Sequence, residues 1–238
     1  MKARLNRRAF LIPGMSEETP DLDDLVRRTD PDRWLSSRFI GDAAARADVI
    51  TLYAFDHELA RAPKVTSNAL LGEIRLTWWR EALDEIFGGK PVRRHPTAEA
   101  LAGAVARRSL PRERLETMID ARYRELDPEP MSEADALDWA RDTGGAAAQL
   151  AAQMLDPATD SKMAIAGGSA WALGKRLDAD PDLRPTFLRV IHAARSASRT
   201  LSVAAFPAVA HAALAGRPAK NDFARRLRLT IAVARGRV

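Results

Sequence analysis

The apolar and polar positions of the chain repeat at helical spacing wherever a clear pattern exists. A first helix is predicted to end near Arg28, and Asp30-Pro31 and Asp42 each offer the start of a following helix. No convincing two-residue alternation, the mark of strands, is evident. The pattern predicts an all-α single domain over residues 16–238, after a loose arm over 1–15. Later helices are predicted at 97–107, 111–126, 132–155, 161–177 and 186–215 (kinked at Pro207), with a basic amphipathic stretch at 221–235.

The stretch from Tyr53 to Gly89 carries the strongest apolar pattern and is predicted to organise the fold. Pro63 should end its first helix, because proline has no amide donor and clashes with the preceding turn. Thr66–Asn68 then offer N-cap side chains for the second helix. That helix has two neighbouring apolar stripes, at positions 71, 74, 78 and 86 and at positions 76, 79, 83 and 87. A face this wide is expected to be buried against more than one neighbour.

The predicted helix at 132–155 has two further signals. Ser132 and Asp135 have the spacing of a capping box at its start. Small residues then recur on one side of the helix, at Ala140, Gly144 and Ala148. Such a ridge allows a second helix backbone to approach closely.

Composition removes several classes of function. The chain has 238 residues and no cysteine, so disulfides, thiolate metal sites and cysteine nucleophiles are excluded. It has no apolar run of about 18 residues, so no membrane span is predicted, and the apolar part of the first 15 residues is too short for a signal peptide. The net charge is +5, but arginine and alanine are abundant throughout and no nucleic-acid-binding motif is evident. No nucleic-acid partner is therefore predicted.

Several segments, taken in order, resemble the squalene/phytoene synthase family. They are DPDRWLSSRF, LYAFDHELA, LGEIRLTWWREALDEIFGG and MIDARYRELDPEPMSEADALDWARDTGGAAAQLAAQML. The similarity is good over residues 30–155 and looser elsewhere. Within the family, the chain resembles short bacterial members that are similar to a mitochondrial complex I assembly factor. The resemblance implies an antiparallel helical bundle around a central cavity, the isoprenoid synthase fold. It also implies a set of cavity-lining candidates: Tyr53, Asp56, Ala60, Lys64, Arg75, Trp79, Asp138 and Asp142.

Active members of that family use two DxxxD motifs on facing helices. The leaving diphosphate carries several negative charges, and Mg²⁺ held by carboxylates must neutralise them before the C–O bond ionises. Here the resemblance places the first motif at Ala60 and Lys64, neither of which can bind magnesium. The second should fall in 166–180, where the helical part has no DxxxD. Both motifs are thus predicted to be degenerate, with no metal, no cofactor and no catalytic residues, and Mg²⁺ is expected only if the chain is an active enzyme.

Other acidic pairs could substitute for the missing motifs. Asp138 and Asp142 have the required spacing on a predicted helix, but a solvated helix start explains them more simply. Asp56 and Glu58 lie two residues apart, so their side chains do not converge on a helix, and Glu58 is predicted to pair with an arginine. The aromatic residues Trp78 and Trp79 are expected in the core rather than in a prenyl tunnel.

Two hypotheses of different classes follow. The first is a non-catalytic member of the family that acts in binding or in respiratory complex I assembly. Its implied partners are respiratory complex subunits or a prenyl lipid, and its implied location is cytoplasmic, peripheral at the inner membrane. The basic amphipathic stretch at 221–235 suits a peripheral membrane contact. The alternative is an active prenyl transferase that condenses two prenyl diphosphates with diverged metal ligands.

Overall fold

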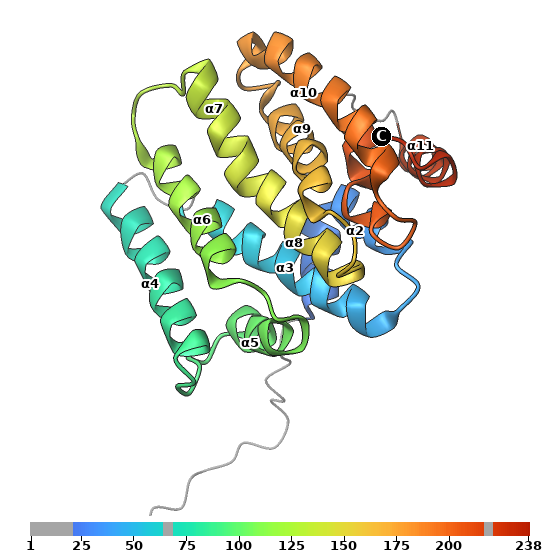
Figure 1. Ribbon diagram of the computed structural model, residues 1–238. Helices are drawn as coiled ribbons and strands as arrows, with labels where there is room; N and C mark the ends of the chain where they lie inside the picture. The colour runs from blue at the N-terminus through green and yellow to red at the C-terminus, as the bar shows by residue number, and fades with distance from the viewer. Residues whose placement is uncertain (1–20, 64–68, 217–220) are drawn as a thin grey trace, which may run out of the picture.

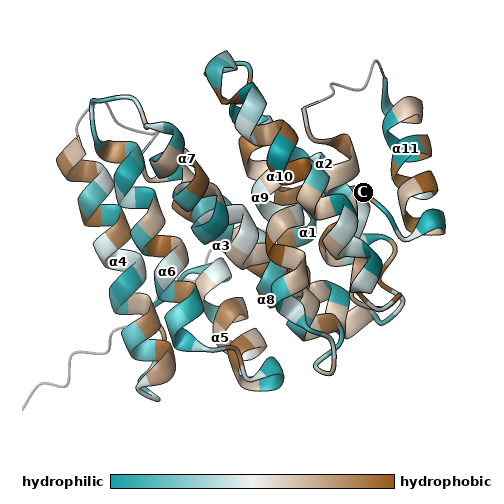
Figure 2. Cartoon of the chain, turned by 45° about the horizontal axis from the view of Figure 1, so that its top comes forward, coloured by the Kyte–Doolittle hydropathy of each residue, from teal (hydrophilic) through white to brown (hydrophobic). Residues whose placement is uncertain are grey.

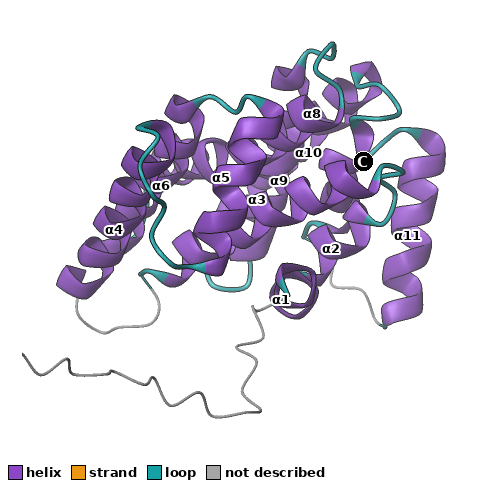
Figure 3. Cartoon of the chain, turned by 90° about the horizontal axis from the view of Figure 1, so that it is seen from below, coloured by secondary structure: helices purple, strands orange, loops and turns teal. Residues whose placement is uncertain are grey.

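The computed structural model describes residues 21–63, 69–216 and 221–238, and within these ranges every regular element is a helix (Figure 3). The predicted all-α class is confirmed. The predicted arm at 1–15, Lys64 and the caps at Thr66–Asn68 lie outside the described residues. The α-helices are α1 (Leu22–Thr29), α2 (Pro31–Ser37), α3 (Ala43–Arg61), α4 (Ala69–Phe87), α5 (Pro96–Arg108), α6 (Arg112–Tyr123), α7 (Glu133–Ala140), α8 (Ala146–Leu155), α9 (Ile165–Arg176), α10 (Arg184–Ala197) and α11 (Asp222–Arg235).

Helix α3 forms the centre of the bundle (Figure 1). It contacts α1, α2, α5, α6 and α8. The side chain of Asp42 accepts a hydrogen bond from the Ala45 amide and so caps its N-terminus. The helix ends at Arg61, two residues before Pro63, as the sequence predicts. Every residue from 48 to 56 is buried, because helices surround α3 on nearly all sides.

The predicted helix at 132–155 is α7 and α8 joined by one π-helical turn at Arg141–Gly145. The capping box of Ser132 and Asp135 is present, as predicted. The predicted close approach is also present: a Cβ on Gly144 would lie 2.5 Å from the Gly168 carbonyl oxygen of α9. The α8 side of the bundle therefore packs backbone to backbone against α9.

Helix α4 differs from the prediction. Its stripe at Leu76, Trp79 and Leu83 is buried, and α4 packs against α6. The other stripe is buried only in part, since Leu71 and Ile74 are exposed while Trp78 and Ile86 are half-buried against the core. Figure 2 shows apolar colour on α4 at the edge of the bundle. The expectation that both stripes are buried is wrong, because an edge helix meets neighbours on one side only.

The predicted long helix at 186–215 is also corrected. Helix α10 stops at Ala197, and the chain continues in short 3-10 turns at Ser198–Thr200, Phe206–Ala208 and Ala210–Leu214. Pro207 cannot donate a backbone hydrogen bond and so does not favour a continuous helix here. Before it, the Ser202 side chain accepts a hydrogen bond from the Ala205 amide, which is typical of a turn. These turns pack against α8, α9 and α2 and close one end of the bundle.

Candidate functional site

A central cavity of about 320 Å³ lies among α1, α2, α3, α6, α7, the π turn and α9. These segments are far apart in the sequence but come together in the middle of the bundle (Figure 1). Tyr53, Asp56 and Ala60 face it from α3, one helical turn apart. The remaining lining is rich in charged and aromatic side chains, including Arg33, Arg122, Glu125, Trp139, Trp171, Lys175 and Arg176.

Asp56 lies between two buried arginines at the wall of this cavity. Arg33 Nη1 is 2.5 Å from one carboxylate oxygen of Asp56, and Arg122 Nη2 is 2.7 Å from the other. Burial alone would raise the pKa of Asp56, but the charges and hydrogen bonds of Arg122 and Arg33 outweigh it and lower the pKa to about 2. Asp56 is thus ionised at neutral pH, and its oxygens are already bound to guanidinium groups.

The ion-pair network continues across the cavity wall. Arg122 Nη1 donates to Glu125 at 2.6 Å, and the indole nitrogen of Trp139 donates to the same carboxylate oxygen at 2.8 Å. Arg33 Nε is 3.7 Å from Asp30, a charge contact that is too long for a hydrogen bond. Side chains from α2, α3, α6 and the turn after α6 are therefore joined by one buried chain of charges, and Trp139 of α7 joins it through a hydrogen bond.

Arg33 is also enclosed by aromatic rings. Its guanidinium carbon lies 3.9 Å from the centre of the Trp171 ring and 5.0 Å from that of Tyr53. His211 packs edge-on against both rings. Burial, and then the charges of Arg33 and Lys175, hold the pKa of His211 well below its ordinary value. His211 is neutral at pH 7, so the positive charge here belongs to the arginines and Lys175.

Several buried donors around the cavity have no hydrogen-bond partner within the described part of the chain. They are Arg33 Nε and Nη2, Arg122 Nε, Arg176 Nε, Trp171 Nε1 and the Tyr53 hydroxyl. An unpaired buried donor costs about 1–3 kcal/mol, so such groups are usually satisfied by water or a ligand. The cavity therefore suits a guest that accepts hydrogen bonds.

The residues present do not fit a magnesium cluster. The carboxylates that line the cavity, Asp30, Asp56 and Glu125, all contact Arg33 or Arg122. Ala60 lines the cavity where the resemblance places a ligand of the first motif. Among the described residues, no group of three or more His, Cys, Asp or Glu side chains is placed to hold a metal ion.

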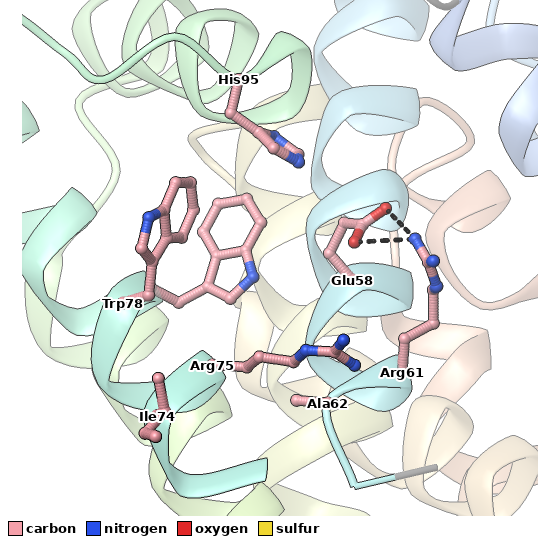
Figure 4. A pocket seen from close by; sticks show the side chains of 8 residues that line it. Glu58, Arg61, Ala62, Ile74, Arg75, Trp78 and His95 are labelled. Carbon is pink, nitrogen blue, oxygen red and sulfur yellow. Dashed lines mark hydrogen bonds and ion pairs between the residues drawn. The ribbon is translucent and has the colours of Figure 1, made fainter. Parts of the chain in front are cut away.

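Arg75 and Trp79 line a different pocket, of about 360 Å³, between α3, α4 and the start of α5 (Figure 4). In this view Arg75 reaches from α4 toward α3, opposite the Glu58–Arg61 ion pair. Glu58 is thus paired with an arginine, as predicted. Trp78 and Trp79 contact each other edge to face at 5.0 Å between ring centres, with Trp78 half-buried and Trp79 buried.

Asp138 and Asp142 lie at a third, shallow pocket, of about 150 Å³. Both contact the guanidinium group of Arg141, at 2.8 and 2.9 Å. The structure therefore places Tyr53, Asp56 and Ala60 at the central cavity, and it places Arg75, Trp79, Asp138 and Asp142 at the two other pockets. Arg33, Arg122 and Trp171 are not among the residues predicted to line the cavity. The only local signal for Arg33 is its position beside Trp34 and Leu35, at the start of an amphipathic helix.

The helical bundle has the all-α isoprenoid synthase fold. The structure superposes on a crystal structure of a dehydrosqualene synthase in complex with ligand, with a TM-score of 0.67, 13% identity, and coverage of 92% of this chain and 96% of that chain. It also superposes on the squalene synthase HpnC from Alicyclobacillus acidocaldarius, with a TM-score of 0.65, 15% identity, and coverage of 90% and 92%. At these identities the likeness establishes the fold.

The squalene/phytoene synthase family model matches residues 26–177, so this chain belongs to that family. Curated relatives include the NADH dehydrogenase (ubiquinone) complex I assembly factor 6 of Bos taurus, which is 32% identical over 104 residues, or 44% of this chain. The Homo sapiens protein of the same name is 31% identical over 104 residues. The match spans 31% of the length of each relative. The family resemblance inferred from the sequence is confirmed.

Proposed function

We propose that this chain is a non-catalytic member of the squalene/phytoene synthase family that acts in the assembly of respiratory complex I. The observation that carries the proposal is the state of Asp56. Its carboxylate, in the cavity wall, is held by Arg33 and Arg122 and not left open for a metal. Diphosphate ionisation without magnesium would lack its main source of charge neutralisation. The assembly role is supported by the names of the relatives matched.

The cavity would then serve binding. Donors on Arg33, Tyr53 and Trp171 that have no hydrogen-bond partner among the described residues suit an acceptor-rich group, such as the polar end of a prenyl lipid. The proposed partners are respiratory complex subunits and such a lipid. The proposed location is the cytoplasmic face of the inner membrane, where a bacterial complex I would be assembled.

The alternative is an active prenyl transferase, which the superposition on a ligand-bound dehydrosqualene synthase favours. One assay distinguishes the two proposed functions. Purified protein is incubated with farnesyl diphosphate and Mg²⁺ beside a squalene synthase as positive control, and diphosphate release is measured. No release above background is expected from this chain. Turnover that scales with its concentration would overturn the non-catalytic proposal.

The assembly role is tested in the organism of origin. Deletion of the gene should lower the amount of assembled complex I on native gels, together with NADH dehydrogenase activity, and leave other respiratory complexes unchanged. The D138N/D142N double variant should restore assembly as well as the unchanged chain, because these carboxylates pair with Arg141 and do not line the central cavity. Normal complex I in the deletion strain would contradict the proposal.

A further inference from the structure

Helix α11 packs on the bundle through one face. Leu229 and Ala232 are buried in this face. The guanidinium group of Arg225 is 3.1 Å from the Asp32 carboxylate and so ties α11 to α2. Figure 3 shows α11 at the edge of the molecule, and most of its remaining residues are exposed. The position of α11 is therefore fixed, and the direction of its outer face is fixed with it.

The outer face of α11 carries a second apolar stripe. Phe223 is 73% exposed, Leu227 48% and Ile231 41%. Residues four apart lie on one side of a helix, so these side chains form a continuous row about 12 Å long. At about 100° per residue, this row lies opposite Leu229 and Ala232. A surface helix of a globular protein normally has one apolar stripe, which faces the core. The stripe of Phe223, Leu227 and Ile231 is here called the outer stripe.

Arginines border the outer stripe on both sides. Helical spacing puts Arg226 along one edge and Arg228 and Arg235 along the other. From Asn221 to Val238 the chain has five arginines and one acidic residue, Asp222, which contacts Arg225 and Arg226. The outer face thus combines apolar side chains with a strong excess of positive charge.

We infer that the outer stripe and its arginines dock α11 on an anionic lipid surface. An interfacial helix lies in the membrane plane, with its apolar residues among the acyl chains and its basic residues at the anionic headgroups. A second copy of this chain is a poor occupant, since it would place like charges against each other around only three apolar side chains. None of the described helices is long and apolar enough to cross a membrane, so α11 would hold the protein at the surface only. The inference is independent of the function of the cavity.

The experiment is flotation of the purified full chain with vesicles. One set contains phosphatidylcholine alone, and the other contains roughly 30 mol% phosphatidylglycerol as the anionic lipid. The chain should float with the anionic vesicles and not with the neutral ones, and salt at about 0.5 M should release it. The F223S/I231S variant should bind at least tenfold more weakly, because it removes most of the outer stripe. Each of R226Q and R235Q should weaken binding about fivefold.

The matched control is L188S on α10. Leu188 is 55% exposed, comparable to the outer stripe, but lies on a different helix. Its substitution should leave flotation unchanged, and all variants should keep the circular dichroism and melting temperature of the parent, because the altered side chains are exposed. The inference is overturned if the chain binds neither vesicle, if it binds both equally, if F223S/I231S floats like the parent, or if L188S loses as much binding as F223S/I231S.

Discussion

Asp56 lies between the guanidinium groups of Arg33 and Arg122, and all three side chains are almost inaccessible to solvent. A buried charge pair adds little net stability over an apolar core, but removing one partner leaves the other charge buried and unpaired. Asp56 is the only carboxylate that contacts both arginines in the described residues. At the residue scale, the loss of Asp56 would therefore cost more than its ion pairs contribute, and both of its oxygens are bound to guanidinium groups rather than open to a metal ion.

Replacement of Asp56 by asparagine should destabilise the protein by about 3–5 kcal/mol at pH 7, because two buried guanidinium groups lose the carboxylate they share and keep only Asp30 at 3.7 Å and Glu125 at 2.6 Å. Urea unfolding measures the change. The D142N variant is the control, since Asp142 lies in a more exposed ion pair with Arg141, and its effect should stay below about 1 kcal/mol. Equal stability of D56N and the parent would show that the network does not stabilise the fold.

The same carboxylate predicts a pH dependence. The pKa of Asp56 is about 2 in the folded chain and about 3.9 in an unfolded one. Because the folded value is the lower one, its stabilisation is complete above about pH 4 and is lost as the pH falls toward 2, on the order of 2 kcal/mol in all. Stability measured between pH 5 and pH 2 should therefore fall less steeply in D56N than in the parent. Equal slopes of stability against pH in D56N and the parent would contradict the assignment of this pH dependence to Asp56.

At the scale of elements, the π turn and α9 approach each other through glycine. A Cβ on Gly168 would lie 2.0 Å from the Gly144 carbonyl oxygen, a backbone atom that cannot move aside without shifting its helix. The small-residue ridge that includes Gly144 was visible in the sequence as a helix-packing signal. Its partner Gly168 was not identified, because a ridge shows that some helix packs closely but not which one.

The G168A variant should lose about 1–3 kcal/mol of stability, because an added methyl group forces the two backbones apart. Gly103 of α5 provides the matched control. The atoms nearest to a Cβ there belong to the end of the Arg107 side chain, which is flexible. The G103A variant should be unchanged or more stable by up to about 1 kcal/mol, since alanine is the better helix former. Thermal unfolding of both variants distinguishes steric crowding from helix propensity. A G168A protein as stable as G103A would show that the approach is looser than described.

At the scale of the whole molecule, the cavity exists only because helices from most of the chain surround it. Its carboxylates are held by arginines from α2 and α6, so magnesium should find no high-affinity site there. A ligand present at 100 times its Kd raises the free energy of unfolding by about 2.7 kcal/mol. The melting temperature should therefore be the same with millimolar Mg²⁺ as with EDTA. A clear rise with Mg²⁺, absent with an equal ionic strength of sodium chloride, would indicate a metal site and favour the transferase alternative.

The sequence alone determined the helical class, the family, the capping box of α7, the end of α3 before Pro63 and the small-residue ridge. The caps, the helix end and the ridge depend on residues close together in the chain, so local spacing reveals them. The family is recognised from the order of its motifs. The family resemblance also implied Tyr53, Asp56 and Ala60 as cavity-lining residues, and all three line the central cavity. It could not tell which of the two α4 stripes meets a neighbour, and there the prediction failed.

Only the tertiary structure determined the environment of Asp56. Its partners Arg33 and Arg122 lie 23 and 66 residues away in the chain, and Trp171 packs on Arg33 from a further helix. Charges paired across such separations leave no periodic signal, because the pairing depends on how helices cross rather than on the spacing within one helix. The same reason applies to α11, whose basic amphipathic character is evident in the sequence. Which of its two apolar stripes remains exposed depends on where Leu229 and Ala232 meet the bundle.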